Sequence, residues 1–245
     1  MIDMERGIRT RLTPASGVAQ SSGYPIWSPD GRTVVFSQTG VLMRKDISSS
    51  GDELPITEPG RLRNPSDWSR DGRFILFSEG NAETNQDLWV LPVTPSGKPV
   101  EGEHAKPFLH SPFNESAGRF SPQPNPQWVA YQSDETGRDE IFIASFPVPR
   151  QKLQVSSGGG HSPQWAANGR ELFYISADDK LTVIGLKMRA GAIEPSRPHA
   201  LFSLDGLSST YDAAPDGKRF LVSQAARDLA PPQVIVNWPA LLRKR

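Results

Sequence analysis

A short box recurs five times, four times led by an aromatic residue, and constrains the fold more than any other feature of the chain. Two copies, Trp27–Ser37 and Trp68–Ser78, share the pattern Trp-Ser-x-Asp-Gly-Arg followed by an apolar run that ends in Phe-Ser. Trp165–Ile175 keeps an Asn-Gly turn, and Phe120–Tyr131 and Ala213–Ser223 are more divergent. The first residues of successive copies are 41, 52, 45 and 48 positions apart. This regular spacing indicates a repeat architecture.

Each box predicts a β-hairpin. Asp-Gly or Asn-Gly between two apolar runs favours a tight turn, because Gly accepts positive φ and Asp or Asn tolerates it. The run after the turn, such as Val34–Phe36 or Ile75–Phe77, is too short for a helix and is apolar on both faces, as in a strand buried between two layers. A second turn, a third strand and a more polar fourth strand follow in most units. Proline in that fourth strand suits a sheet edge.

We therefore predict an all-β fold, a β-propeller of about five four-stranded antiparallel blades within one domain that fills residues 1–245. The expected repeat units are approximately residues 23–58, 63–112, 115–157, 160–205 and 208–238. The fifth unit lacks an obvious fourth strand, which residues 1–20 are expected to supply by closing the ring, and residues 239–245 are a tail. The alternative is a portion of a six- or seven-bladed propeller.

Charge and composition exclude several classes of partner. The chain has 27 basic and 27 acidic side chains, so no broad basic field is available to nucleic acid or to an anionic membrane. No stretch approaches 18 apolar residues, and we expect no direct insertion into a membrane. The first residues lack the apolar core of a secretory signal. Cysteine is absent, which rules out disulfides and thiolate chemistry.

The motifs of catalysis and metal binding are missing from the sequence. There is no Gly-x-Ser-x-Gly pentad. The four histidines form no closely spaced pair that would bind a metal. The repeated aspartates Asp30, Asp71 and Asp216 stand in predicted turns, where turn formation explains them better than a carboxylate site. We predict no catalytic residue, no metal and no cofactor.

Polar residues just before the boxes are the candidate binding residues. If the chain is a propeller, they lie on the innermost strands around the central channel. The candidates are Asn64, Asp67, Glu115, Arg119, His161, Gln164, Tyr211 and Asp212. Two interpretations remain open: they bond to neighbouring inner strands and channel water, or they form a polar funnel for a peptide or small polar ligand. The tryptophans that lead the boxes are expected to pack between blades.

The box resembles the repeat of TolB-like propellers of the Tol-Pal type, which belong to the WD40-like repeats of bacteria. The resemblance extends from about residue 8 to residue 238. The ending, residues 232–244, is similar to the final segment of the C-terminal propeller of some bacterial serine/threonine kinases, although no kinase motif occurs here. Similar repeats form the gating domain of prolyl-oligopeptidase-like peptidases. TolB-like propellers typically have six blades, so five visible units are a departure.

The resemblance implies a non-enzymatic scaffold that binds a protein or peptide through its channel mouth and loops. The alternative is an accessory propeller separated from its catalytic domain, either the sensor or ligand-binding end of a bacterial serine/threonine kinase or the gating propeller of a peptidase. The chain would then be part of a longer polypeptide. The resemblance also implies a periplasmic or otherwise extracytoplasmic location; without an export signal, the expectation from the chain alone is the cytoplasm.

Overall fold

The computed structural model describes Leu12 and residues 22–48, 51, 53–189, 191–205, 207, 210–223 and 233–235. These residues form five antiparallel sheets, each built from strands that are consecutive in the chain. The described part of the chain contains no helix that could cross a membrane. The closing strand predicted within residues 1–20 and the tail at 239–245 lie outside the described residues, apart from Leu12.

The first three sheets have four strands each. Sheet 1 comprises β1 (Ser22–Trp27), β2 (Thr33–Gln38), β3 (Val41–Asp46) and β4 (Leu54–Pro55). Sheet 2 comprises β5 (Arg63–Trp68), β6 (Phe74–Asn81), β7 (Asn85–Pro92) and β8 (Lys106–Leu109). Sheet 3 comprises β9 (Glu115–Phe120), β10 (Trp128–Ser133), β11 (Glu140–Ser145) and β12 (Lys152–Gln154).

The last two sheets depart from this pattern. Sheet 4 comprises β13 (Gly160–Trp165), β14 (Glu171–Ser176), β15 (Lys180–Arg189), β16 (Ala192–Pro195) and β17 (His199–Ser203), with both β16 and β17 paired to β15. The additional strand arises because β15 is long enough to pair with one partner along each of its halves. Sheet 5 shows three strands in the described residues, β18 (Tyr211–Ala213), β19 (Phe220–Val222) and β20 (Gln233–Ile235).

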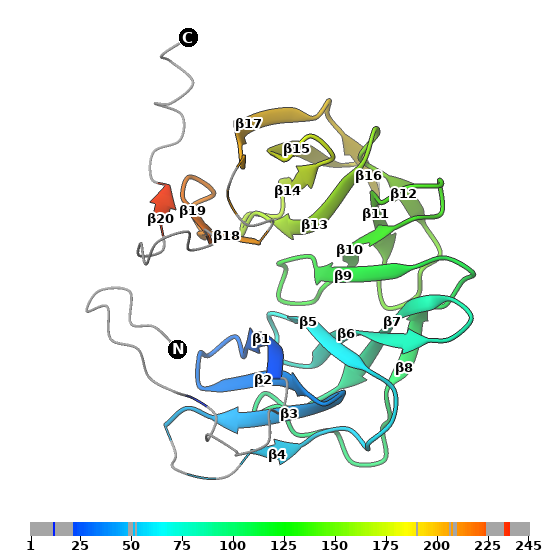
Figure 1. Cartoon of the computed structure of the whole chain (residues 1–245), viewed down its shortest axis with the longest axis vertical. Helices are drawn as coiled ribbons and strands as arrows, with labels where there is room; N and C mark the ends of the chain where they lie inside the picture. Colours follow the sequence, from blue (N-terminus) through cyan, green and yellow to red (C-terminus); the bar gives the residue numbers. More distant parts are fainter. Residues whose placement is uncertain are drawn as a thin grey trace.

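The sheets are arranged radially, as in a β-propeller (Figure 1). The first strand of each sheet, β1, β5, β9, β13 or β18, lies innermost, and later strands lie further out. Sheets 1 and 5 stand at the two ends of the arc, on the left of the view. The chain is thus an all-β propeller, as the repeated boxes predict.

Hydrogen bonds within the box explain its sequence. In sheet 2 the Ser69 hydroxyl donates to the Asp71 carboxylate (2.7 Å) and accepts the Phe74 N–H (2.9 Å). Gly72 has φ of +76° and donates its N–H to the Ser69 carbonyl (2.8 Å). A side chain at residue 72 would be strained in this conformation. The box is therefore a hairpin connection, and its aspartate serves the turn.

In sheets 2, 3 and 4 the second strand packs against both neighbouring sheets, because successive side chains point to opposite faces. In β6, Ile75 and Phe77 join the apolar cluster between sheets 1 and 2, and Leu76 joins the cluster between sheets 2 and 3. In β10, Tyr131 joins the cluster between sheets 2 and 3, and Ala130 joins the cluster between sheets 3 and 4. This is why these short strands are apolar on both faces.

The residue that leads each box packs toward the preceding sheet. Trp68 is 5% exposed in the cluster between sheets 1 and 2, and Phe120 is 4% exposed in the cluster between sheets 2 and 3. Trp165 is half-buried against the cluster between sheets 3 and 4. Trp27 differs, because it is 46% exposed. The expected interblade packing therefore holds for three aromatic leads, and Trp27 leaves much of its ring facing solvent.

Replacing the equivalent tryptophans should have unequal effects on stability. Trp68→Ala is expected to lower the free energy of unfolding by about 3–5 kcal/mol, because it opens a cavity in an apolar cluster. Trp27→Ala should cost roughly half of that or less, since much of its ring is already in water. Urea denaturation followed by circular dichroism measures both variants. Equal losses would contradict the difference in packing.

Candidate functional site

Each inner strand contributes to the wall of a central cavity, and on every one of these strands the residue just before the lead of the box is among those that line it. These five residues are Ile26, Asp67, Arg119, Gln164 and Asp212. The cavity they line has a volume of about 440 Å³. Its wall also carries aromatic rings from the box leads, namely Trp27, Trp68, Phe120 and Trp165.

An irregularity in the inner strands lies beside these residues. The pairing register shifts next to Ile26 in β1, Asp67 in β5 and Gln164 in β13. Ala117 and Ser162 lie in the shifted segments and have φ of +52° and +55°. A β-bulge of this kind re-aims the side chains that follow it. The bulge accounts for one inward-pointing residue at the same position of successive blades.

Asp67 links two sheets through backbone hydrogen bonds. Its carboxylate accepts the N–H of Trp68 (2.9 Å) and, across the blade boundary, the N–H of Phe120 (2.7 Å). Desolvation by the surrounding blades raises the pKa of Asp67 to about 6, against the opposing effect of Arg119. One oxygen is therefore engaged within β5, and the other holds sheets 2 and 3 together.

Gln164 makes the corresponding link between sheets 4 and 5. Its amide nitrogen donates to the Tyr211 carbonyl (2.6 Å), and its amide oxygen accepts the Ala213 N–H (3.1 Å). The Tyr211 hydroxyl returns a bond to the Ser162 carbonyl (3.0 Å). Phe120 and Ala213 lead their boxes, so Asp67 and Gln164 accept equivalent N–H groups on the next sheet.

Arg119 occupies the same position and cannot make this link, because a guanidinium has donors but no acceptor. Sheets 3 and 4 are joined instead by the Trp165 indole N–H, which donates to the Arg119 carbonyl (3.1 Å). Within the described residues, nothing accepts a hydrogen bond from the Arg119 guanidinium. This half-buried group lies near Asp67 and Asp212 and interacts with both through charge alone.

Asp212 also has no bond to a neighbouring sheet among the described residues. The N–H of the adjacent Ala213 lies beside its carboxylate. The wall of the cavity desolvates the carboxyl and raises its pKa, while Arg119 acts in the opposite direction. Asp212 keeps access to solvent at the channel mouth. Of the four polar residues just before the box leads, Asp67 and Gln164 link neighbouring sheets. The charged residues Arg119 and Asp212 form no such link among the described residues.

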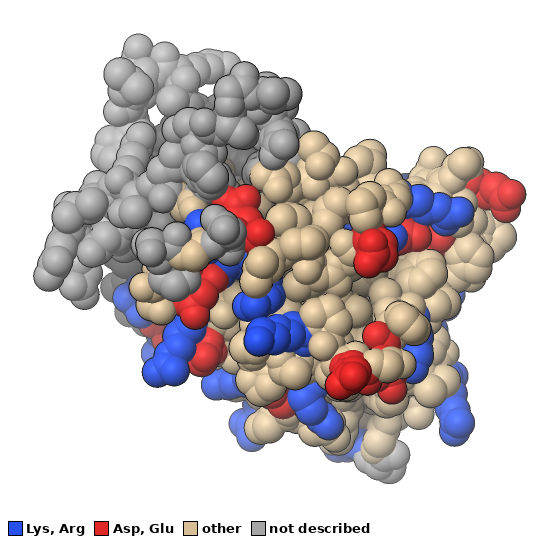
Figure 2. Space-filling model, turned by 90° about the horizontal axis from the view of Figure 1, so that it is seen from below, with Lys and Arg blue, Asp and Glu red and all other residues tan. Residues whose placement is uncertain are grey.

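The cavity gathers five of the eight residues that the sequence nominates: Asp67, Arg119, Gln164, Tyr211 and Asp212. For Asp67, Gln164 and Tyr211 the structure supports the interpretation that they bond to neighbouring inner strands. The charge balance of the cavity is completed by Arg70, whose guanidinium contacts the Pro122 carbonyl (3.4 Å). Away from the cavity, Lys and Arg are interspersed with Asp and Glu on the face shown in Figure 2.

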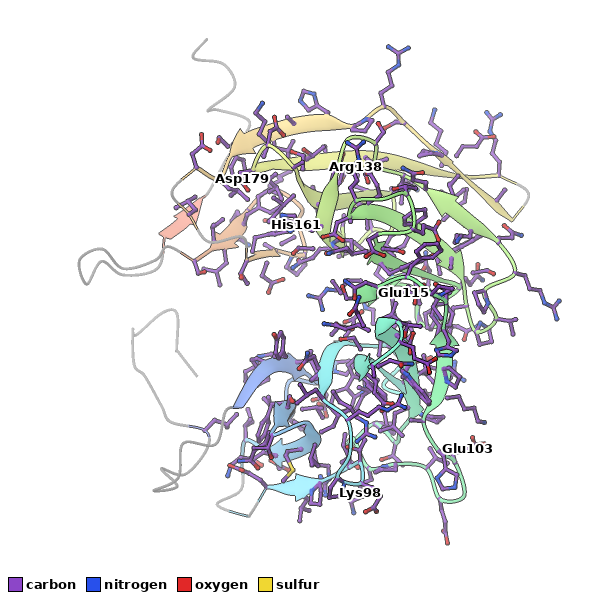
Figure 3. All side chains as sticks on the ribbon, turned by 45° about the vertical axis from the view of Figure 1, so that its right-hand side comes forward. Lys98, Glu103, Glu115, Arg138, His161 and Asp179 are labelled. Carbon is purple, nitrogen blue, oxygen red and sulfur yellow. The ribbon has the colours of Figure 1, made fainter. Side chains whose placement is uncertain are left out.

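Asn64, Glu115 and His161 do not line the cavity. They lie at the other end of their strands, before the bulge, where Asn64 pairs with Ser78. Glu115 is 3% exposed and accepts a hydrogen bond from the Ser111 hydroxyl; burial raises its pKa. His161 is half-buried, and burial lowers its pKa. Figure 3 labels Glu115 and His161 on neighbouring inner strands.

Sequence reasoning missed several contributors to the cavity wall, Ile26, Trp27 and Arg70 among them. Ile26 holds the same position as Asp67 but is apolar, so a search for polar residues passes over it. Trp27 is predicted from the sequence to pack between blades, and Arg70 stands at the variable position of the box, so neither is a binding candidate. Aligning the boxes on their leads would have found Ile26. No sequence signal distinguishes Trp27 from Trp68.

Breaking the Gln164 link should destabilise the contact between sheets 4 and 5. Gln164→Leu keeps the size of the side chain but leaves the Tyr211 carbonyl and the Ala213 N–H without their partner, at an expected cost of about 1–3 kcal/mol. Urea denaturation measures this loss. Gln151→Leu changes an exposed glutamine and should be close to neutral. The link would be unimportant if both variants unfolded at the wild-type urea concentration.

Asp67 should make stability depend on pH. Its native pKa of about 6 is above the ordinary value of 3.8, so the folded chain keeps a proton that the unfolded chain releases between these values. Wild-type stability should therefore fall, relative to Asp67→Asn, as the pH rises from about 4 to about 7. Urea denaturation across this range measures the difference. A constant difference would show that the Asp67 pKa is not raised.

No family model matches the chain, and no curated protein matches its sequence. Among solved structures, TolB from Acinetobacter baumannii is similar with a TM-score of 0.64 and 16% identity, over 89% of this chain and 52% of that one. An oligogalacturonate lyase in complex with manganese has a TM-score of 0.65 and 14% identity, over 98% of this chain and 67% of that one. The periplasmic gluconolactonase PpgL of Pseudomonas aeruginosa has a TM-score of 0.60 and 16% identity, over 90% and 69%.

The chain spans about half the length of the Acinetobacter TolB. The similar structures include enzymes as well as TolB, and identities this low establish the architecture alone. Within the described residues, no three His, Asp or Glu side chains are placed to hold a metal ion. The radial sheets, the inner-strand cavity and these structural similarities together show that the chain has the fold of a TolB-like β-propeller.

Proposed function

We propose that this chain is a non-enzymatic scaffold that binds a protein or peptide segment at the mouth of its channel. One observation carries the proposal. Of the four polar residues at this position of the inner strands, Asp67 and Gln164 link neighbouring sheets, whereas Arg119 and Asp212 line the cavity and form no such link with the residues that the structure describes. Charged groups that do not serve the fold are available to a ligand.

The surroundings of Arg119 favour binding. A cavity of about 440 Å³ accommodates a few side chains of a partner but not a folded domain. Trp27 presents an exposed aromatic ring on the same wall. Arginine and aromatic residues contribute most of the binding energy in many protein interfaces. A peptide segment inserted into the mouth would contact both kinds of group at once.

The hydroxyl groups on the cavity wall support binding in preference to catalysis. Ser66 donates to the Leu76 carbonyl (3.2 Å), and Ser121 accepts the N–H groups of Gln127 and Trp128. These serines hold the backbone of the hairpins, and neither has a base beside it in the described hydrogen bonds. Asp67 likewise has both oxygens on backbone N–H groups. Each would have to leave a structural bond to take part in a reaction.

An extracytoplasmic location is part of this proposal. It is supported by the structural similarity to TolB and to a gluconolactonase described as periplasmic. Fractionation of the native cells, with detection of the chain by antibody, tests it. Recovery with the cytoplasmic fraction would contradict the location without affecting the binding role.

The binding role is tested by selecting peptides from a random heptapeptide phage library on the folded chain. Peptides that bind should lose about tenfold or more in affinity when Arg119→Gln removes the charged donor. Isothermal titration calorimetry with the synthetic peptides measures the loss. Arg138→Gln is the matched control, because it removes an exposed arginine from the turn between β10 and β11. It should leave the affinity unchanged.

Two outcomes would contradict the proposal. Peptides that bind equally to wild type and Arg119→Gln would place binding elsewhere on the chain. Failure to select any peptide on the folded wild-type chain would argue against a peptide receptor. Circular dichroism of each variant confirms that the fold is intact before the affinities are compared.

A further inference from the structure

We propose that the channel binds a ligand that bears a carboxylate, such as an acidic peptide, and that Arg119 is the residue that holds this carboxylate. The inference rests on the proposed function and names the chemistry that the same site would recognise. The inference also predicts how the binding affinity changes with pH, because the charges of two acidic groups of the channel compete with the ligand for Arg119.

The first argument is the hydrogen-bonding capacity of Arg119. A guanidinium has five N–H donors in a planar fork that matches the two oxygens of a carboxylate. None of these donors is engaged by a described residue, although the side chain is half-buried in the channel wall. Leaving donors without partners in a partly desolvated place is unfavourable. A ligand carboxylate would satisfy two of them at once.

The second argument is that the neighbouring carboxylates are held away from direct pairing. Asp67 directs its two oxygens to the N–H groups of Trp68 and Phe120. Asp212 lies on sheet 5, with the Ala213 N–H beside its carboxylate. Neither forms an ion pair with Arg119 among the contacts of the described residues. Both lower the net charge around Arg119 without occupying its donors.

The third argument concerns the other groups of the cavity. Sheet 2 contributes Asp67 and Arg70, sheet 3 contributes Arg119, and sheet 5 contributes Asp212 and Tyr211. Burial raises the pKa of Tyr211 well above its ordinary value, so this phenol stays neutral. The cavity residues of sheets 1 and 4, Ile26, Trp27, Gln164 and Trp165 among them, do not titrate. The charge of the site near pH 6 is therefore governed by Asp67, and Asp212 is a second carboxyl of the site whose pKa is raised.

Asp67 and Asp212 determine whether the affinity for a ligand carboxylate rises or falls with pH. The pKa of Asp67 is raised to about 6 and that of Asp212 is also raised, both by desolvation. As the pH falls through about 6, Asp67 becomes neutral. The raised pKa of Asp212 means that this carboxyl also takes up its proton at a higher pH than an ordinary aspartate. The electrostatic potential around Arg119 then becomes more positive. A ligand carboxylate, whose pKa is about 4, remains ionised at pH 5 and should bind more tightly there.

The test uses three acetylated and amidated tetrapeptides, Gly-Trp-Glu-Gly and the same sequence with Gln or Lys in place of Glu. Binding to the wild-type chain is followed by the indole signals in two-dimensional ¹⁵N–¹H spectra at about pH 5 and about pH 7.5. The Glu peptide should bind more tightly than the Gln peptide, with an advantage that increases about tenfold toward pH 5. Arg119→Gln should abolish the advantage, and Arg138→Gln should keep it.

Asp212→Asn supplies a second variant that leaves Arg119 in place. Removing one competing carboxylate should strengthen binding of the Glu peptide at about pH 7.5 by about threefold or more and reduce its pH dependence. If neither the affinity for the Glu peptide nor its pH dependence changed in Asp212→Asn, Asp212 would not compete with the ligand for Arg119, and this part of the inference would be wrong. Asp205→Asn, at an exposed position on the loop after β17, should behave as wild type.

The remaining outcomes separate this inference from the proposed function. Equal affinity of the Glu and Gln peptides, with both weakened by Arg119→Gln, would overturn the carboxylate class but leave peptide binding in place. Tighter binding of the Lys peptide, weakening as the pH falls, would identify a cation site on Asp212 and also overturn the inference. Absence of binding by all three peptides, when library-selected peptides bind, would overturn it as well. Loss of both kinds of binding would remove the proposed function.

Discussion

The apolar packing between neighbouring sheets is the interaction on which the rest of the structure depends. In sheets 2, 3 and 4 the second strand places alternate side chains against its two neighbours, as Ile75 and Leu76 do in β6. Each sheet is therefore a wedge that cannot bury both faces alone. This packing brings the inner strands of different sheets together and creates the channel that they enclose.

Polar side chains complete the contacts between sheets at the inner strands. Asp67 and Gln164 accept equivalent backbone N–H groups on the next sheet, although one is an acid and the other an amide. Arg119 stands in the same position without an acceptor to offer. The residue at this position links neighbouring sheets in the blades of Asp67 and Gln164 but, among the described residues, not in the blade of Arg119. A binding site can therefore arise at Arg119 with little effect on the stability of the fold.

The same architecture accommodates binding proteins and enzymes, since the structural relatives include TolB, a lyase and a lactonase. The fold therefore says little about activity, and the argument for function has to come from individual side chains. Among the described residues, the cavity-lining groups that link no neighbouring sheet include a guanidinium, a carboxylate and an exposed indole ring, those of Arg119, Asp212 and Trp27. They provide charge and contact area, which suits recognition.

The hairpins, their number and their common architecture were predictable from the sequence, because Asp-Gly turns and runs such as Val34–Phe36 act over a few residues. The candidate site was only partly predictable. Asp67, Arg119 and Gln164 reach the cavity, whereas Asn64, Glu115 and His161, a few residues earlier on the same strands, do not. A bulge in the inner strand decides between them, and its position depends on pairing with the next strand. The tertiary structure alone also decided that Trp27 is exposed while Trp68 is buried, because the burial of each ring depends on the sheet that lies against it.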